Sequence, residues 1–500
     1  MDFYNQYDLR LSGRIKDQTA FELIEAIEQK FPVDSIQLQD GTKLWNLIRI
    51  FLYSNYQHIG EKAGSRAVNI ETFRSFLVTL KEGFTPLRPP NNPIWGFSSG
   101  ESRKDYQDTY YDIYLDPLYD ILGDRLAVLE WPETSGIRRK YNKPVYSHTY
   151  LPMHIPLWTK TFWQLLIYQL RHRRTFRIQS EDTLKQVITY VSTTASINEQ
   201  HLTNDLYDFI TIFTYIKGYL STFLEHQPPQ AVLIRCGYGR FPQALAQACR
   251  QHHIPSIELQ HGLITAYLPA YRRTTPTTNH DCIPEYLCAQ GEAYANLVKT
   301  GNLFPPTHIK ATGYPYLEKS LTQPTNKNIL TKYSPYPQNL LVTSQWIVAT
   351  EMQNFFLQVA TILKEQHTDI GILFKPHPYD KNDYSHCQAN DHFFLVKKYD
   401  DIFKLLPLVD LHSTVYSTSG LEAMAFGKPN IFIDINHYIT NESPYITATP
   451  DDFVKKITTI LQNYDTVSQE IKAVAALFFT PQPTTKFTHF FTDLNLLPNH

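Results

Sequence analysis

The sequence lacks several features that would point to other classes of protein. Its five cysteines include no Cys-x-x-Cys pair, which argues for reduced thiols and against a disulfide framework or a structural zinc site. No apolar run approaches the roughly 18 to 20 residues of a membrane-spanning helix, and the charged N-terminus has no signal-peptide core. The 46 basic and 48 acidic residues nearly balance, so the chain has no global positive charge for nucleic acid. We therefore expect a cytoplasmic protein, soluble or peripheral to the membrane, that binds no nucleic acid.

Metal-binding and dinucleotide-binding motifs are also missing. The sequence contains neither His-Glu-x-x-His nor Asp-x-Asp. Asp112, Asp116 and Asp120 recur every fourth residue, which indicates a solvated helix face rather than a ligand set. The lone Gly237-x-Gly239 lacks the third glycine and the acidic residue of the dinucleotide fingerprint. We therefore expect neither a metal nor a cofactor.

The sequence pattern predicts more than one domain. A chain of 500 residues is too long for one ordinary core. Proline-rich stretches at 86–93 and 322–338 mark candidate boundaries. We predict four parts: a helical N-terminal extension (1–90), an N-terminal Rossmann-like domain (91–322), a C-terminal Rossmann-like domain (335–480) and a C-terminal tail that packs back on the N-terminal domain (481–500).

Short apolar runs alternate with helical patterns in both predicted domains. This alternation is typical of βαβ units and a parallel sheet. It predicts an α/β fold of two Rossmann-like domains that face each other across a cleft. The expected strands are 125–130, 231–235, 256–260, 339–345, 371–374, 406–411 and 430–434, and the expected helices include 19–29, 70–80, 243–252, 350–366, 422–426 and one that opens at Thr449.

The segment Lys375-Pro376-His377-Pro378 follows one of these strands. In open α/β sheets, ligands bind at the carboxyl ends of the strands. The two prolines stiffen the backbone on both sides of His377. His377 could then donate to a phosphate oxygen, and Lys375 would add a positive charge. The alternative is a rigid turn whose histidine caps a neighbouring helix.

A second polar segment, Ser417-Thr418-Ser419, precedes a predicted helix some forty residues later. The first turn of a helix offers unpaired N–H groups and the positive end of its dipole, which together attract anions. Glu422, in this helix, could hold the vicinal hydroxyls of a sugar. The alternative is a capping box, in which Glu422 reaches back to Ser419.

His261 follows a buried strand in the other predicted domain and precedes a glycine. There it could act as a general base or hold a leaving phosphate. The alternative is a turn residue with satisfied hydrogen bonds. Arg235 and Arg240 could approach a phosphate or lie on the surface, and the segment 313–315 (Gly-Tyr-Pro) indicates a structural turn.

Taken in the order of the chain, these motifs resemble bacterial GT-B glycosyltransferases of surface-polysaccharide assembly: His-Gly after a strand, Gly-x-Pro, Lys-Pro-His-Pro, and Ser-Thr-Ser followed by Glu422 and Gly-Lys-Pro (427–429). These enzymes include capsule Kdo transferases, polysialyltransferases and CDP-glycerol glycerophosphotransferases, and the resemblance covers about residues 230 to 435. It implies that the C-terminal domain binds the nucleotide of the donor, with Glu422 at the ribose. The other donor-binding residues implied are Ser344, Gln345, Lys375, His377, Pro378, Ser417, Thr418 and Ser419.

The same resemblance suggests the catalytic groups, all from the acceptor-side N-terminal domain. His261 matches the catalytic histidine of the glycerophosphotransferases, although Leu263 and Ile264 replace the Thr-Pro that usually follows it. This departure disfavours polyol-phosphate transfer. A carboxylate usually serves as base or nucleophile, and the candidates are Glu130, Glu133 and Asp112. A GT-B enzyme needs no metal, because helix N-termini and cationic side chains can neutralise the leaving phosphate.

We therefore expect a glycosyltransferase with a nucleotide-activated sugar donor. CMP-linked acidic sugars such as Kdo or a nonulosonate are favoured, while UDP- and GDP-sugars stay open. The expected acceptor is a surface polysaccharide or a lipid-linked glycan, reached in association with other assembly enzymes at the inner face of the membrane. The alternatives are a polyol-phosphate transferase, a GT-B-fold sugar-nucleotide epimerase and a non-catalytic protein that binds a glycan or nucleotide.

Overall fold

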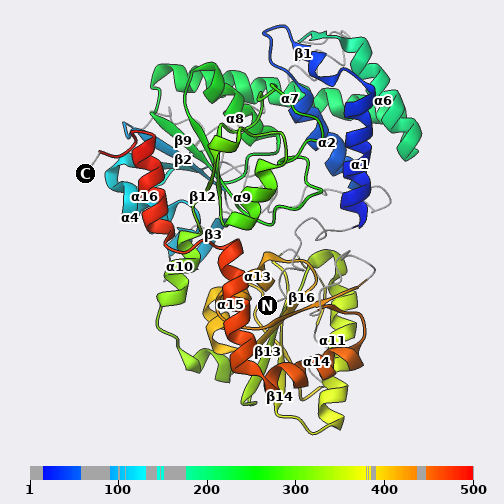
Figure 1. The fold of residues 1–500 in the computed structure, drawn as a ribbon, viewed down its shortest axis with the longest axis vertical. Coiled ribbons are helices and arrows are strands. Elements are labelled where there is room, and N and C mark those ends of the chain that lie inside the picture. Colours follow the sequence, from blue (N-terminus) through cyan, green and yellow to red (C-terminus); the bar gives the residue numbers. More distant parts are fainter. Residues whose placement is uncertain are drawn as a thin grey trace.

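The computed structural model describes residues 15–57, 91–99, 102–106, 109–130, 143–146, 148–150, 176–378, 380, 382–384, 390–435 and 446–498. These residues form two α/β domains, one above the other in Figure 1. The predicted helix at 70–80 and the candidate Glu133 lie outside the described residues.

The N-terminal domain is built on a parallel sheet of seven described strands. Their order is β12-β11-β10-β9-β2-β5-β7, and every neighbouring pair is parallel. Sequences such as Ala-Val-Leu-Ile in β9 are buried throughout, as expected for a parallel sheet covered on both faces. The strands are β2 (Ile94–Ser98), β5 (Leu126–Glu130), β7 (His148–Tyr150), β9 (Ala231–Ile234), β10 (Ser256–Leu259), β11 (Tyr286–Ala289) and β12 (Ile309–Ala311).

The C-terminal domain repeats this architecture with six described strands. Their order is β15-β14-β13-β16-β17-β18, again parallel throughout. The strands are β13 (Gln338–Thr343), β14 (Ile370–Lys375), β15 (Phe393–Leu395), β16 (Leu411–Thr414), β17 (Asn430–Ile433) and β18 (Ile446–Thr447). The strand predicted at 406–411 is wrong, because the chain forms a 3₁₀ turn at Leu406–Leu408 and the strand begins at Leu411.

Helices connect the strands of both sheets. They are α8 (Arg240–Gln251) and α9 (Glu292–Lys299) in the N-terminal domain, and α11 (Ala349–Glu365), α12 (Ile402–Leu405), α13 (Thr418–Ala425) and α14 (Pro450–Gln462) in the C-terminal domain. Helix α14 begins as predicted, because the side chain of Thr449 accepts a hydrogen bond from the Asp452 N–H and proline fills the first helical position. None of the helices within the described residues has the length and apolar composition needed to cross a membrane.

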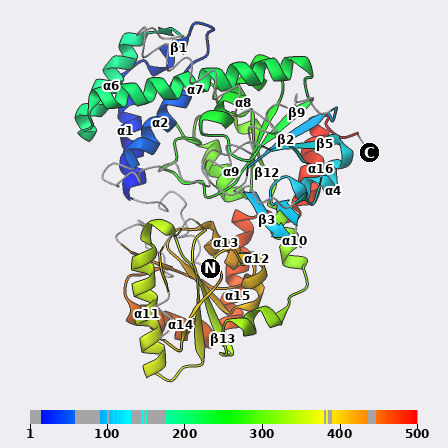
Figure 2. The ribbon, with the colours of Figure 1, turned by 180° about the vertical axis from the view of Figure 1, so that it is seen from behind.

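The N-terminal extension packs beside the N-terminal sheet, and both views show it there (Figure 1, Figure 2). It consists of α1 (Ile15–Lys30) and α2 (Trp45–Gln57), joined by β1 (Gln37–Leu38). Strand β1 pairs antiparallel with β8 (Ile178–Gln179). The two helices share one hydrophobic core with α6 (Glu181–Ala195), α7 (Glu199–His226) and α8. The extension is therefore part of the N-terminal domain's core.

A small sheet lies where the two domains meet. It pairs β3 (Arg103–Tyr106) with β4 (Thr109–Asp112), and β4 with β6 (Lys143–Pro144). A 3₁₀ turn at Asp116–Leu118 and the short helix α4 (Tyr119–Leu122) follow β4. The prediction of a solvated helix face is therefore wrong, because Asp112 lies in a strand, Asp116 in a 3₁₀ turn, and both are buried.

The chain crosses between the domains at two places. Helix α10 (Pro315–Thr322) leads from β12 towards the C-terminal domain, and α15 (Tyr464–Phe478) leads back, packing on both α13 and α9. Helix α16 (Pro483–Asp493) then lies on the N-terminal domain (Figure 1), where its buried Phe487, Phe490 and Phe491 join a cluster that includes Ile94 of β2.

Candidate active site

The carboxyl ends of strands from both sheets meet around one tyrosine. Tyr114, just after β4, donates a hydrogen bond from its hydroxyl to the backbone oxygen of His261 (2.6 Å). Burial raises the pKa of Tyr114, and the charge of Glu422 on α13 raises it further. Tyr314, after β12, stacks on Tyr114 with ring centroids 5.6 Å apart. Leu421, the residue before Glu422 on α13, packs in the same hydrophobic cluster as Tyr114 and Tyr314, so residues of both domains surround this pair of rings.

His261 is half-buried directly after β10. Its Nε2 lies 3.3 Å from the hydroxyl oxygen of Tyr238, and its buried Nδ1 has no hydrogen-bond partner among the described residues. Burial, with a contribution from the positive charge of Arg235, lowers the pKa of His261 to about 3. The imidazole is therefore neutral at physiological pH, with one ring nitrogen left for a further hydrogen bond.

The turn that carries His261 is held by the residue before it. The side chain of Gln260 donates to the carbonyl of Gly262 (2.7 Å) and accepts from the backbone N–H of Gln290 (2.7 Å). Gln260 is buried and makes the satisfied contacts that a structural turn requires. The alternative interpretation, a turn residue with satisfied hydrogen bonds, therefore describes Gln260 better than His261.

The two candidate arginines lie in different surroundings. Arg235 donates to the hydroxyl of Ser99, and its guanidinium carbon lies 5.9 Å from the ring centre of Tyr114. Arg240, at the start of α8, lies over the ring of Phe209 on α7 (5.4 Å). The structure thus brings Arg235 towards His261, whereas Arg240 packs on a helix of the domain core.

The Lys-Pro-His-Pro segment places two basic groups at the end of β14. Lys375 is buried and donates from Nζ to the carbonyl of Lys398 (2.9 Å). Burial lowers the pKa of Lys375 to about 8, and the nearby charge of Lys104 acts in the same direction. His377 is half-buried, and burial together with the charge of Lys375 lowers its pKa to about 4. Pro378 is exposed. A bound anion would relieve the repulsion between these groups.

The Ser-Thr-Ser segment forms the N-terminus of α13. Ser417 is the N-cap and its side chain accepts from the N–H of Ser419 (3.3 Å), while Thr418 is the first helical residue. Ser419 turns inward, where its hydroxyl lies 2.7 Å from that of Thr343. The capping-box alternative is wrong, because the cap is Ser417 and Glu422 therefore lies too far along the helix to reach back to it.

Ser344 and Gln345 tie these loops together at the end of β13. The N–H of Ser344 donates to the carbonyl of Lys375 (3.0 Å). The side-chain oxygen of Gln345 accepts from the N–H of Tyr416 (3.2 Å). Both residues are buried. They hold the segments after β14 and β16 on either side of β13.

The carboxyl group of Glu422 binds its proton more tightly than an ordinary glutamate does. Burial raises its pKa to about 7; the charge of Lys104 opposes this rise, and that of Asp401 adds to it. The group is therefore divided between its two protonation states near neutral pH. A carboxyl in this state can either donate to or accept from a substrate hydroxyl.

The carboxylates predicted as base or nucleophile are engaged in local structure. Asp112 accepts from the hydroxyl of Ser98 (2.5 Å) and from the N–H groups of Tyr114 (2.9 Å) and Leu115 (3.0 Å). Glu130 accepts from the Tyr110 hydroxyl and lies 3.7 Å from Arg103. Both are buried. A catalytic role for either stays a prediction, and Glu133 lies outside the described residues.

Sequence reasoning missed four residues of this site: Lys104, Tyr114, Tyr238 and Tyr314. The Gly-Tyr-Pro turn was the one available signal, and it contains Tyr314, which precedes α10 and stacks on Tyr114. Lys104 lies on β3, opposite Tyr111 of β4. Its charge acts on Lys375, His377 and Glu422, all in the other domain. No local pattern marks such a residue, since its neighbours come from distant parts of the chain.

The C-terminal part of the site falls within a known family pattern. Residues 310–482 match the family model described as CDP-glycerol:poly(glycerophosphate) glycerophosphotransferase. The matched span contains Lys375, His377, the Ser-Thr-Ser segment and Glu422, whereas His261 precedes it. A search of curated proteins finds no match.

Solved structures resemble the chain across both domains. A UDP-N-acetylglucosamine 2-epimerase aligns at 14% identity over 82% of this chain and 98% of its own, with a TM-score of 0.51. A Listeria monocytogenes protein provisionally assigned as the same epimerase aligns at 12% identity over 81% of this chain and 97% of its own, also with a TM-score of 0.51. The wall teichoic acid polymerase TagF aligns at 12% identity over 87% and 100%, with a TM-score of 0.47. The epimerase likenesses confirm a GT-B-like fold of two Rossmann-like domains.

Proposed function

We propose that this protein is a transferase that uses a cytidine-nucleotide-activated donor and releases CMP. The group transferred is a polyol phosphate, from a CDP-linked donor such as CDP-glycerol, or an acidic sugar, from a CMP-linked donor such as CMP-Kdo. The acceptor is a hydroxyl group of a surface polysaccharide or of a lipid-linked glycan. In both versions of the reaction CMP leaves, so one donor pocket serves either chemistry.

The observation that carries this proposal is the meeting of groups from both sheets around Tyr114. His261 and Arg235 come from the N-terminal domain, and the C-terminal domain contributes α13, where Leu421, next to Glu422, packs in one cluster with Tyr114 and Tyr314. Lys375, His377 and Glu422 all lie within range of the positive charge of Lys104 on β3. Such a site can hold a phosphate and a hydroxyl next to each other, which is what transfer to an acceptor hydroxyl requires.

The residues present divide the chemistry between them. In polyol-phosphate transfer, the acceptor oxygen forms a bond to the distal phosphorus of the donor, and the bond from that phosphorus to the CMP oxygen breaks. His261, which is neutral at physiological pH, takes the acceptor's proton. Protonated Lys375 and the N–H groups at the start of α13 stabilise the charge on the phosphates. A phosphate beside Arg235 would also offset the charge that lowers the pKa of His261.

Two observations favour different donors. The family match over 310–482 supports a CDP-linked polyol. The Leu263-Ile264 pair, in place of the Thr-Pro of those transferases, disfavours the polyol, and the paired His-Pro and Ser motifs favour a CMP-linked acidic sugar. Glu422 fits both, because a ribose or a glycerol group presents vicinal hydroxyls to it.

Nucleotide release from purified protein tests the proposal. The protein is incubated with CDP-glycerol, CMP-Kdo or UDP-N-acetylglucosamine, with and without a glycan acceptor, and the nucleotides are separated by chromatography. We expect acceptor-dependent CMP release from one cytidine donor and a fall of about a hundredfold or more in His261→Ala and His377→Ala. The control His201→Ala changes an exposed histidine of α7 and should keep full activity. Release from neither cytidine donor, or release that persists in both site variants, would reject the proposal.

A further inference from the structure

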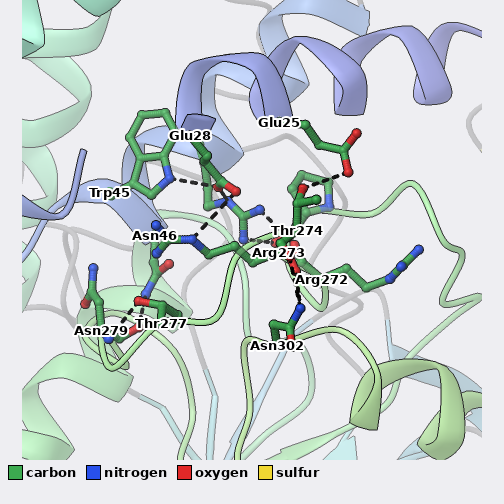
Figure 3. Close-up of polar contacts among 12 residues, drawn as sticks. Glu25, Glu28, Trp45, Asn46, Arg272, Arg273, Thr274, Thr277, Asn279 and Asn302 are labelled. Carbon is green, nitrogen blue, oxygen red and sulfur yellow. Dashed lines mark hydrogen bonds and ion pairs between the residues drawn. The ribbon is translucent and has the colours of Figure 1, made fainter. Parts of the chain in front are cut away.

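The segment that follows His261 is a long connection bound by the N-terminal extension. Residues 262–285, between β10 and β11, contain no helix or strand. Irregular connections of this length are uncommon inside a compact domain and are often functional. Here the backbone is held by side chains of α1 and α2. Figure 3 shows these contacts, with Asn46 beside Asn279 and Glu28 beside Arg273 of the connection.

Arg49 of α2 is the centre of this contact. Its guanidinium donates to the carbonyls of Pro269 (2.7 Å) and Arg272 (2.7 Å). Its Nε lies 3.0 Å from a carboxylate oxygen of Glu28. Arg49 is 1% exposed. The two carbonyls lie on either side of Tyr271, so Arg49 sets the path of the backbone at that residue.

Arg49 lies in a set of four charged residues, of which Glu28 and Arg273 are buried with it and Asp34 is partly exposed. The indole of Trp45 donates to Glu28 (2.9 Å). Arg273 forms two hydrogen bonds to the carboxylate of Asp34 (3.0 and 2.9 Å), and its Nε lies 3.6 Å from Glu28. Two arginines thus face two carboxylates. Burying charges is costly even when they are paired, so this arrangement is weak evidence for stability and better evidence for a geometric requirement.

Tyr271 connects the Arg49 contact to His261. Its hydroxyl donates to Glu258 of β10 (2.6 Å). Its ring packs edge-on against that of Tyr238, with the ring centroids 6.0 Å apart and an angle of 89° between the ring planes. The hydroxyl of Tyr238 lies 3.3 Å from Nε2 of His261. A continuous series of contacts therefore runs from Arg49 through Tyr271 and Tyr238 to the imidazole.

We propose that Arg49 is a positioning residue for His261. By fixing the backbone on both sides of Tyr271, it holds Tyr238 against the imidazole and so determines the orientation of the ring. The N-terminal extension, which bears no recognisable motif, then influences His261 indirectly, through the backbone of the connection that Arg49 binds. The inference rests on the proposed function only in that His261 takes part in the reaction.

The orientation of His261 can be measured directly by NMR. In protein labelled with ¹³C at histidine Cε1, the signal of His261 is assigned by its loss in His261→Gln. We expect Arg49→Lys and Tyr238→Phe each to shift this signal, and the double variant to shift it by less than the sum of the two. An unchanged signal in Arg49→Lys beside a shifted one in Tyr238→Phe would overturn the proposal.

Kinetics provide the second readout. Arg49→Lys should lower kcat by about ten- to a hundredfold with little change in the donor KM, because a displaced catalytic group costs rate rather than binding. The control is Arg125→Lys, since Arg125 also donates to a backbone carbonyl, that of Leu496 (2.9 Å), but lies before β5, which is three strands away from β10 in the sheet. It should leave kcat and the His261 signal unchanged.

The two proposals can fail separately. If Arg49→Lys does not fold, Tyr271→Leu breaks the same series of contacts at its middle and should give the same two results. If no donor releases CMP, the proposed function fails, and the NMR comparison still decides whether Arg49 orients His261. Equal losses of kcat in Arg49→Lys and Arg125→Lys would show a general structural effect and reject the positioning role.

Discussion

Single side chains at this site have proton affinities far from their ordinary values. Burial is the first cause in each case: it lowers the pKa of His261, Lys375 and His377 and raises that of Glu422. Perturbed groups gathered in one place are typical of functional sites. They also make pH a direct probe of what each residue does.

The pKa of Lys375 predicts the pH above which the reaction slows. Its pKa of about 8 means that the charge which attracts the donor phosphates disappears above that pH. We expect kcat/KM to fall as the pH rises through about 8. In Lys375→Arg the charge persists, because a guanidinium stays protonated, so the fall should move beyond pH 10 or so. The measurement is a pH profile of kcat/KM; an unchanged alkaline limb in the variant would show that another group titrates.

The raised pKa of Glu258 predicts that the stability of the fold depends on pH. It is 1% exposed, and burial raises its pKa to about 7. The folded state then holds its proton more tightly than the unfolded chain, so this group's contribution to stability is complete below about pH 4.5 and is lost as the pH rises to about 7. The free energy of unfolding should therefore fall with rising pH by up to about 3 kcal/mol less in Glu258→Gln than in the wild type.

Denaturant unfolding between pH 5 and pH 8 measures this effect. The comparison variant is Glu351→Gln, which neutralises an exposed glutamate of α11 and should leave the decline in place. Parallel curves for wild type and Glu258→Gln would contradict the prediction.

At the scale of elements, two glycines allow the chain to return from one domain to the other. A Cβ on Gly291, which precedes α9, would lie 2.3 Å from the backbone carbon of Phe478, at the end of α15. Gly313 has a φ of +86°, and a Cβ there would lie 2.5 Å from the carbonyl of Thr480. The last turn of α15 can approach the N-terminal domain because neither position carries a side chain.

Gly291→Ala should therefore destabilise the protein. The added methyl group meets backbone, which cannot swing aside as a side chain could, so we expect a loss of about 1 to 3 kcal/mol. Gly218→Ala is the matched control, because among the described residues no atom beyond the helix's own neighbouring backbone lies within 4 Å of a Cβ at this position in α7. It should be neutral or should stabilise by about 0.5 to 1 kcal/mol. Thermal unfolding of both variants measures the difference, and equal melting temperatures would contradict the packing argument.

At the scale of the whole molecule, the C-terminal helix belongs to the core of the N-terminal domain. Phe491 of α16 is fully buried in a cluster with Ile94 and Leu126, from β2 and β5. The chain thus crosses between the domains twice, through α10 and through α15, and ends on the N-terminal domain with α16.

Phe491→Ala should weaken the N-terminal sheet. A buried phenylalanine changed to alanine costs about 3 to 5 kcal/mol. In hydrogen exchange, we expect protection to fall first in β2 and β5. Phe453→Ala, the comparison variant, empties the core of the C-terminal domain and should act on β13 and β14 instead. Loss of protection confined to the C-terminal sheet in Phe491→Ala would contradict this assignment of α16.

Local sequence predicted the elements that bear the motifs. Continuous apolar runs predicted β9, β10, β13 and β14 to within a residue or two, because strands buried on both faces need them. The strand after residue 405 was misplaced, since a 3₁₀ turn and a strand both suit an apolar run of that length. Ser417 rather than Ser419 caps α13, a choice that depends on backbone conformation.

The sequence by itself determined the α/β class, the two Rossmann-like domains and the strand ends that carry His261, Lys375 and Ser417, because hydrophobic periodicity and turn residues act within a few residues of the chain. Only the tertiary structure decided which groups meet there. Lys104, Tyr114 and Arg49 reach the site across more than a hundred residues of chain, and their contacts and charge interactions arise from tertiary packing that no local pattern encodes.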